Sequence, residues 1–270
     1  MSISILNSNQ TIRLFVLSML ICIWHFAGFP VEQNNATAAE GSEKRKSVKV
    51  AIDERSKKQS TFTSGGRRIR TEWFYAATGA SAPTVIMLPG SGGVEDTGGF
   101  FRDMAHYLSN NGINAVIVRY MDRSGINTAD GAQMGANFGK WFQTVHDAVK
   151  FVQYQPGVDS KRVSILGHSL GSQLALHAAA SDPSIVSVVD MAGCFVLPTG
   201  KISHMPPVLI LHGSADSVVP LRRERQMVTV LKRVGARYQE HIFKNADHAF
   251  ANVSEEDLFR PITNFLKTSL

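Results

Sequence analysis

The stretch Gly-His-Ser-Leu-Gly, residues 167–171, places a serine between two glycines where one apolar run ends and another begins. When such a G-x-S-x-G turn joins a strand to a helix, the serine takes strained dihedral angles. The backbone also passes so close that small residues are needed two positions away on either side. The turn exposes the hydroxyl and directs the next helix N-terminus toward a developing negative charge. Ser169 is therefore predicted to be a nucleophile.

A serine hydroxyl needs a general base, and the base needs a carboxylate to orient it. The segment PVLILHGSADSVVP supplies Asp216 after an apolar run, and NADHAF supplies His248 after the next one. Both residues follow predicted strands, at the edge of a parallel sheet where active sites form. Asp247 is the alternative carboxylate, but adjacent side chains in a loop rarely point the same way. We therefore expect Asp216 to orient His248.

Donors for an oxyanion are expected in the segment IMLPGSGG, whose glycines let the backbone approach a ligand closely. By analogy with HGGG-type loops, the N–H groups of Ser91 and Leu170 would form the oxyanion hole, and Gly92 would contact the substrate. A phosphate-binding turn is the alternative. The loop lacks the Lys-Ser/Thr ending of a P-loop and the spacing of G-x-G-x-x-G, which disfavours that alternative.

Apolar runs that alternate with helical patterns must position these residues. The expected strands cover residues 70–76, 84–88, 115–120, 162–166, 185–190, 208–211 and 238–243. The expected helices cover residues 99–110, 140–155, 170–181, 221–234 and 255–267. Several strands are almost continuous in Val, Ile and Leu, as in sheets covered on both faces. The alternation predicts an α/β fold with a mostly parallel central sheet and helices on both faces.

One domain, residues 61–270, is expected, because the sequence has no internal repeat and no second shift in composition. Residues 1–38 read as a secretory signal, with Arg13 ahead of an apolar run and a small-x-small cleavage site at Ala36–Ala38. An uncleaved membrane anchor is the alternative. Residues 39–60 are polar and predict a linker. We accordingly expect an exported protein, periplasmic or secreted.

The net charge of +6 comes largely from a basic cluster near the N-terminus, which has no interleaved aromatic residues and no nucleic-acid-binding motif. No nucleic-acid partner is therefore expected. Oligomeric state is left open by the sequence.

The chain resembles the dienelactone hydrolase-like branch of the α/β-hydrolases from about residue 70 to residue 265. The resemblance rests on IMLPGSGG, GKWFQTVHDAVKFVQYQPGVDSKRVSILGHSLGSQLAL, PVLILHGSADSVVP and NADHAF. It implies an α/β-hydrolase fold and cleavage of esters, lactones or related acyl bonds without a cofactor. Ser169 replaces the cysteine of true dienelactone hydrolases, which favours general esterase chemistry. Pro89 stands where many hydrolases have histidine.

Other chemically capable residues have weaker claims. Residues 121–139 are polar and glycine-rich, so they are expected either to line the pocket, with Arg123 meeting an anionic substrate, or to form a surface loop. His168 is expected to face away from the site, His212 to be packed and hydrogen-bonded, and Cys194 to be a buried thiol. No histidine pair has the spacing of zinc ligands, so no metal is expected.

The sequence thus favours a serine esterase acting on a small-molecule ester, lactone or thioester. An oligopeptidase-type serine peptidase shares the motif order, although such enzymes usually carry a gating domain. A non-catalytic binding protein with the same fold is a third possibility. Activity of the esterase should rise with pH near neutrality as the histidine loses its proton.

Overall fold

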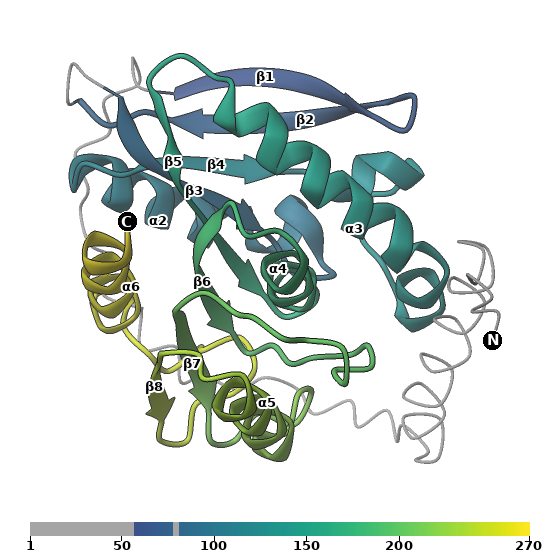
Figure 1. The fold of residues 1–270 in the computed structure, drawn as a ribbon, viewed down its shortest axis with the longest axis vertical. Helices are drawn as coiled ribbons and strands as arrows, with labels where there is room; N and C mark the ends of the chain where they lie inside the picture. Colours follow the sequence, from purple (N-terminus) through teal and green to yellow (C-terminus); the bar gives the residue numbers. More distant parts are fainter. Residues whose placement is uncertain (1–56, 78–80) are drawn as a thin grey trace, which may run out of the picture.

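The computed structural model describes residues 57–77 and 81–270, where eight strands form one sheet in the order β1-β2-β4-β3-β5-β6-β7-β8 (Figure 1). The strands are β1 (Lys57–Ser64), β2 (Arg67–Phe74), β3 (Ala82–Leu88), β4 (Asn114–Val118), β5 (Val158–His168), β6 (Ile185–Met191), β7 (Val208–Gly213) and β8 (Tyr238–Phe243). β1 and β2 pair antiparallel, as do β2 and β4, whereas all pairs from β4 to β8 are parallel. The predicted α/β fold with a mostly parallel sheet is confirmed.

Helices cover both faces of this sheet (Figure 1). They are α2 (Gly93–Asn110), α3 (Gly131–Gln153), α4 (Leu170–Ser181), α5 (Leu221–Arg233) and α6 (Glu255–Ser269), with a short 3-10 helix η2 (Tyr120–Ser124). The helices α3, α4 and α5 pack in one apolar cluster, and α2 and α6 pack in the other.

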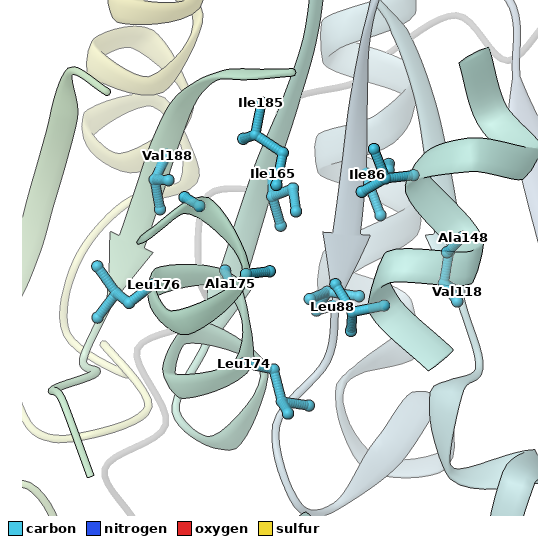
Figure 2. Packing of buried hydrophobic residues seen from close by; sticks show 14 of the residues in the cluster. Ile86, Leu88, Val118, Ala148, Ile165, Leu174, Ala175, Leu176, Ile185 and Val188 are labelled. Atoms are coloured by element: carbon cyan, nitrogen blue, oxygen red, sulfur yellow. The ribbon is translucent and has the colours of Figure 1, made fainter. Parts of the chain in front are cut away.

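Successive side chains of the central strands pack alternately in the two apolar clusters. In β3, Ile86 and Leu88 join the cluster under α3 and α4, while Val85 and Met87 join the cluster under α2 and α6. Figure 2 shows Ile86 and Leu88 facing the layer that holds Ala148 of α3 and Leu174 of α4. Burial on both sides explains why these strands read as unbroken apolar runs.

The largest differences between the structure and the expected elements lie at three places. Residues 57–60, expected in a linker, form the first half of β1, an edge strand that buries only alternate residues such as Phe62 and Ser64. The helix α3 begins at Gly131 and not near residue 140, because Asp130 and Gln133 form a capping box. The helix α2 begins at Gly93, six residues before the expected start, directly after the glycine loop.

The expected polar loop at residues 121–139 is therefore mostly η2 and the first turns of α3. The expected secretory signal at residues 1–38 lies outside the described residues. In the part of the chain that is described, no helix combines the length and hydropathy of a membrane span.

Candidate active site

Ser169 occupies a single-residue turn between β5 and α4, with φ of 52° and ψ of −117°. A positive φ is strained for a residue with a side chain, and strain of this kind concentrates at functional sites. A Cβ added to Gly167 would lie 2.4 Å from the backbone of Gly171, and one added to Gly171 would lie 2.0 Å from the Leu88 carbonyl oxygen. Both glycines are thus needed for the turn to close, as the sequence predicted.

The loops after β7 and β8 bring the other two residues to Ser169. The Nε2 atom of His248 lies 2.9 Å from the Ser169 hydroxyl oxygen, and its Nδ1 lies 2.8 Å from an Asp216 carboxylate oxygen. Because a carboxylate only accepts, the imidazole proton is on Nδ1, and Nε2 is left to accept the serine proton. The structure therefore joins Ser169, His248 and Asp216 in one hydrogen-bonded chain.

The Asp216 carboxylate is fully enclosed, and all its hydrogen bonds favour the ionised form. Its other oxygen accepts the backbone N–H groups of Val218 and Val219, each at 2.8 Å. Burial alone raises the pKa of Asp216, but the bonds from His248 and these two amides outweigh burial and hold that pKa below its usual value. Asp216 is therefore an anion beside the imidazole.

Backbone bonds between the two loops fix Asp216 relative to His248. The Ser214 N–H donates to the Phe243 carbonyl, and the Ala215 N–H donates to the Ala246 carbonyl, at 2.9 and 3.0 Å. The loops approach so closely at Gly213 that a Cβ there would lie 2.3 Å from the Ala246 oxygen. The carboxylate and the imidazole are thus carried by one rigid pair of loops.

The glycine loop after β3 lies against the turn from β5 into α4 that carries Ser169, called the elbow below. A Cβ on Gly90 would be 3.4 Å from the Cβ of Ser169. The loop is held from behind, where the buried Tyr120 hydroxyl donates to the Pro89 carbonyl at 2.8 Å and the Ala129 N–H donates to the Ser91 carbonyl at 2.8 Å. Leu170 is the first residue of α4, so its N–H has no acceptor within the helix.

The three residues expected near the substrate lie in two different places. Gly92 directly precedes α2 and Ser91 is partly exposed, in the loop whose Gly90 lies against Ser169, and their contact with a substrate stays a prediction. The guanidinium of Arg123 instead donates to the Gly65 carbonyl, in the turn between β1 and β2 at the outer end of the sheet. The expectation that Arg123 meets a substrate is therefore not supported by this structure, because the Gly65 carbonyl holds the guanidinium.

The expectations for three other chemically capable residues agree with the structure. His212 is buried and hydrogen-bonded to the Val219 carbonyl at 2.7 Å, and Cys194 is buried. Asp247 is exposed, and its carboxylate accepts the Ala251 N–H, so it does not orient His248.

His168 was expected to face away from the site in a structural role, and the expected direction was wrong. Its Nε2 lies 3.0 Å from the His248 carbonyl oxygen. Nothing in the local sequence signals this contact, which depends on where the loop after β8 folds back.

Among residues 57–77 and 81–270, no group of three or more His, Cys, Asp or Glu side chains is arranged to hold a metal ion.

Together, the doubly covered sheet, the strained serine turn and the loops after β7 and β8 define an α/β-hydrolase. Solved structures share this fold. The chain superimposes with a TM-score of 0.66 on a dienelactone hydrolase-like promiscuous phosphotriesterase from metagenomic libraries, at 20% identity and with 79% of this chain and 98% of that chain covered. It superimposes with a TM-score of 0.64 on an acylaminoacyl peptidase from Pyrococcus horikoshii, at 15% identity over 79% of this chain and 42% of that chain.

Residues 73–264 match the dienelactone hydrolase family, and the chain belongs to that family. Among curated proteins it is 31% identical over 117 residues to the thiohydrolase apmlB of Arthrinium phaeospermum, which is 43% of this chain and 36% of that protein. It is 26% identical over 140 residues to the polyketide transferase grgF of a Penicillium species, which is 52% of this chain and 45% of that protein. The chain thus spans less than half the length of these relatives.

Proposed function

We propose that this member of the dienelactone hydrolase family is a serine hydrolase that cleaves carboxylic esters, or related lactones or thioesters, of small substrates. The observation that carries the proposal is the continuous hydrogen-bonded chain from the Ser169 hydroxyl through His248 to the enclosed Asp216 carboxylate, at 2.9 and 2.8 Å. No cofactor and no nucleic-acid partner are part of the proposal.

In the first step the Ser169 oxygen attacks the substrate carbonyl carbon while His248 Nε2 takes the hydroxyl proton. The Asp216 anion stabilises the imidazolium that forms. The N–H groups of Ser91 and Leu170 donate to the tetrahedral oxyanion. When the intermediate collapses, the bond from carbon to the leaving oxygen or sulfur breaks, and His248 returns its proton to the leaving group.

In the second step water attacks the acyl-enzyme. His248 takes a proton from the water, the oxyanion forms in the same place, and collapse breaks the bond to the Ser169 oxygen. The proton passes to that oxygen, a carboxylic acid leaves, and the serine is regenerated. Every step uses side chains of this chain and water.

The relatives support acyl substrates of more than one kind. The relative named a thiohydrolase supports thioesters as substrates. Esters are supported by Ser169, because a serine in place of the cysteine of true dienelactone hydrolases favours general esterase chemistry. The shared fold with an acylaminoacyl peptidase favours a peptidase as second candidate. Rates on an aryl ester, a matched thioester, a lactone and an aminoacyl peptide, measured in parallel, separate these candidates.

The substitution Ser169→Ala tests the proposal. It removes the nucleophile without changing the packing, so we expect kcat/KM on an aryl ester to fall by about 10⁴-fold or more with little change in Tm. The matched control is Ser254→Ala, which removes a surface hydroxyl that caps α6 and should leave kcat/KM unchanged. A folded Ser169→Ala variant that keeps most of its activity would remove Ser169 from the mechanism. Failure of Ser169 to react with a fluorophosphonate in the wild-type protein would favour a binding protein instead.

We further propose that the protein is exported, with residues 1–38 as its signal or as an uncleaved anchor. Expression of the full chain, followed by fractionation and N-terminal sequencing, tests this. A mature N-terminus near residue 39 in the periplasm or medium is expected for a cleaved signal, and full-length chain in the membrane for an anchor. Full-length chain in the cytoplasm would contradict export.

A further inference from the structure

His168, the last residue of β5, is hydrogen-bonded to the backbone of residue 248. Its Nε2 lies 3.0 Å from the His248 carbonyl oxygen. A carbonyl oxygen only accepts, so the His168 proton is on Nε2 and Nδ1 carries a lone pair. The tautomer of His168 is thereby fixed by its neighbour.

The same ring also fills the space between two functional loops. Its centroid lies 5.1 Å from that of the His248 ring and 6.4 Å from that of Phe250. On the other side, a Cβ built on Gly90 would lie 3.0 Å from His168 Nδ1. His168 therefore separates the loop that carries the base from the glycine loop that carries the Ser91 amide, and contacts both.

Residues 168 and 169 attach His248 at two points. The Ser169 hydroxyl bonds to the imidazole of His248, and His168 bonds to the carbonyl of the same residue. The bonds to Asp216 and Ser169 hold the two ring nitrogens of His248, and the bond from His168 holds the backbone carbonyl of the same residue. Residues 168 and 169 thus contact both the backbone and the ring of His248.

We infer that His168 is a positioning residue that holds the His248 imidazole in line with the Ser169 hydroxyl by donating Nε2–H to the His248 carbonyl. The inference rests on the proposed function. His168 touches no reacting atom, so its effect passes through His248. A displacement of the base by about 1 Å can cost about 10²-fold in rate, so one hydrogen bond at this place has a measurable effect.

The environment of His168 suits this role. Burial, helped by the nearby His248, lowers the pKa of His168 to about 4, although the bond to the carbonyl opposes the shift. His168 is therefore neutral near pH 7. It places no positive charge beside the imidazolium that forms during catalysis.

Three variants of His168 separate the hydrogen bond from the packing. His168→Gln keeps an N–H donor at a similar reach, whereas His168→Phe keeps a ring without a donor, and His168→Asn ends short of the carbonyl. We expect kcat on an aryl ester to fall by about 10- to 100-fold in the Phe and Asn variants, with KM changed far less, and to stay within about threefold of wild type in the Gln variant.

His177→Gln is the matched control. Like His168, His177 of α4 is a histidine whose pKa burial lowers to about 4, and it accepts the backbone N–H groups of Val196 and Leu197 at 3.2 Å. Its substitution should lower Tm and leave kcat unchanged. If His177→Gln lowers kcat as much as a His168 variant with a similar loss of Tm does, then lost stability explains the lower rates. That result would overturn the inference.

Two further results would also overturn it: wild-type kcat in both His168→Phe and His168→Asn, or an equal loss in the Gln variant. If one variant does not fold, the other still decides. Ser169→Ala, assayed in the same series, keeps the two proposals distinct. An inactive Ser169→Ala beside fully active His168 variants removes only the positioning role, whereas an active Ser169→Ala removes the proposed function.

Discussion

The two oxygens of the Asp216 side chain have separate partners, and this division determines how the residue acts. One oxygen accepts the His248 Nδ1–H, and the other accepts the amides of Val218 and Val219. A nearby third group, His212 Nε2, lies 3.5 Å from the oxygen that faces His248. The sequence predicted Asp216 from its place after an apolar run. It did not identify the amides, which lie two and three residues after Asp216 in the same loop, where an aspartate side chain can bond to its own backbone.

Asp216→Asn should therefore disturb one of these two sets of hydrogen bonds. Its amide N–H₂ must face either the imidazole or the Val218 and Val219 amides, so the imidazole loses its correct tautomer or the turn loses its acceptor. We expect kcat to fall by about 10³- to 10⁴-fold while the protein remains folded at neutral pH.

The stability effect of the same variant depends on pH. Because the folded-state pKa of Asp216 lies below its unfolded value, the ionised carboxylate stabilises the fold above about pH 4, and this contribution is lost as pH falls through the lower, folded-state pKa. Urea unfolding from pH 3 to 8 should show wild type exceeding the variant above pH 4, with the difference narrowing below it. A constant difference across that range would contradict the ionised assignment.

At the scale of elements, the turn from β5 into α4 was the most predictable part of the molecule. The helix at residues 170–181 has the expected bounds, because the glycines that flank Ser169 allow one way of joining strand and helix. The starts of α2 and α3 were less predictable. Both helices begin in glycine-containing segments whose apolar periodicity is weak, and their starts depend on tertiary contacts and on the Asp130 cap.

Two glycine substitutions test the packing at this turn. Gly171→Ala places a Cβ 2.0 Å from the Leu88 carbonyl oxygen, which is backbone and cannot rotate aside. We expect a loss of about 2 kcal/mol or more in the free energy of unfolding, with reduced activity, since the elbow must shift to accept the methyl group. Urea unfolding and kcat measure both effects.

Gly139→Ala is the control for that substitution. Gly139 lies inside α3, and nothing lies within 4 Å of a Cβ built on it. Alanine there should stabilise the protein by up to about 1 kcal/mol. If Gly171→Ala proves as harmless as Gly139→Ala, the close approach of α4 to β3 is not required for the fold.

At the scale of the whole molecule, the order of the strands was not predictable from the sequence, although the alternation of strands and helices predicted a mostly parallel sheet. The strand β1 was missed because its sequence, KKQSTFTS, is polar and only one of its faces is buried. The site itself was largely predictable, since Ser169, Asp216 and His248 follow three different strands whose carboxyl ends meet at one rim. Contacts between loops, such as that of His168 with His248, were not.

The stability of the whole protein should depend on pH through the carboxyl group of Asp190, which is hydrogen-bonded to α4. Asp190, at the end of β6, is fully buried, accepts a hydrogen bond from Ser172 of α4, and has one oxygen without a partner. Burial raises its pKa to about 7, although the bonds from Ser172 and the Gly193 amide oppose the shift. The folded state thus holds a proton that the unfolded state releases near pH 4. Its contribution to stability is complete below about pH 4 and is lost as pH rises to about 7.

Asp190→Asn should flatten part of the decline in unfolding free energy between pH 4 and 7. A second component remains, because burial and the neighbouring Glu240 raise the pKa of Glu224 to about 7 as well. Urea titrations at several pH values check this. The control is Asp159→Asn, a surface aspartate whose pKa is lowered by its hydrogen bond with Arg162, and which should keep the wild-type slope. Equal slopes in wild type and Asp190→Asn would exclude a buried proton on Asp190.

The most direct measurement of the role of Ser169 is the mass of the chain during turnover. An aryl ester with a slowly hydrolysed acyl group is mixed with the protein, the reaction is quenched in acid, and the chain and its peptides are weighed. We predict a mass increase of one acyl group, located on the peptide that contains Ser169 and absent from Ser169→Ala. Turnover without a covalent adduct, or an adduct on Cys194, would contradict the proposed mechanism.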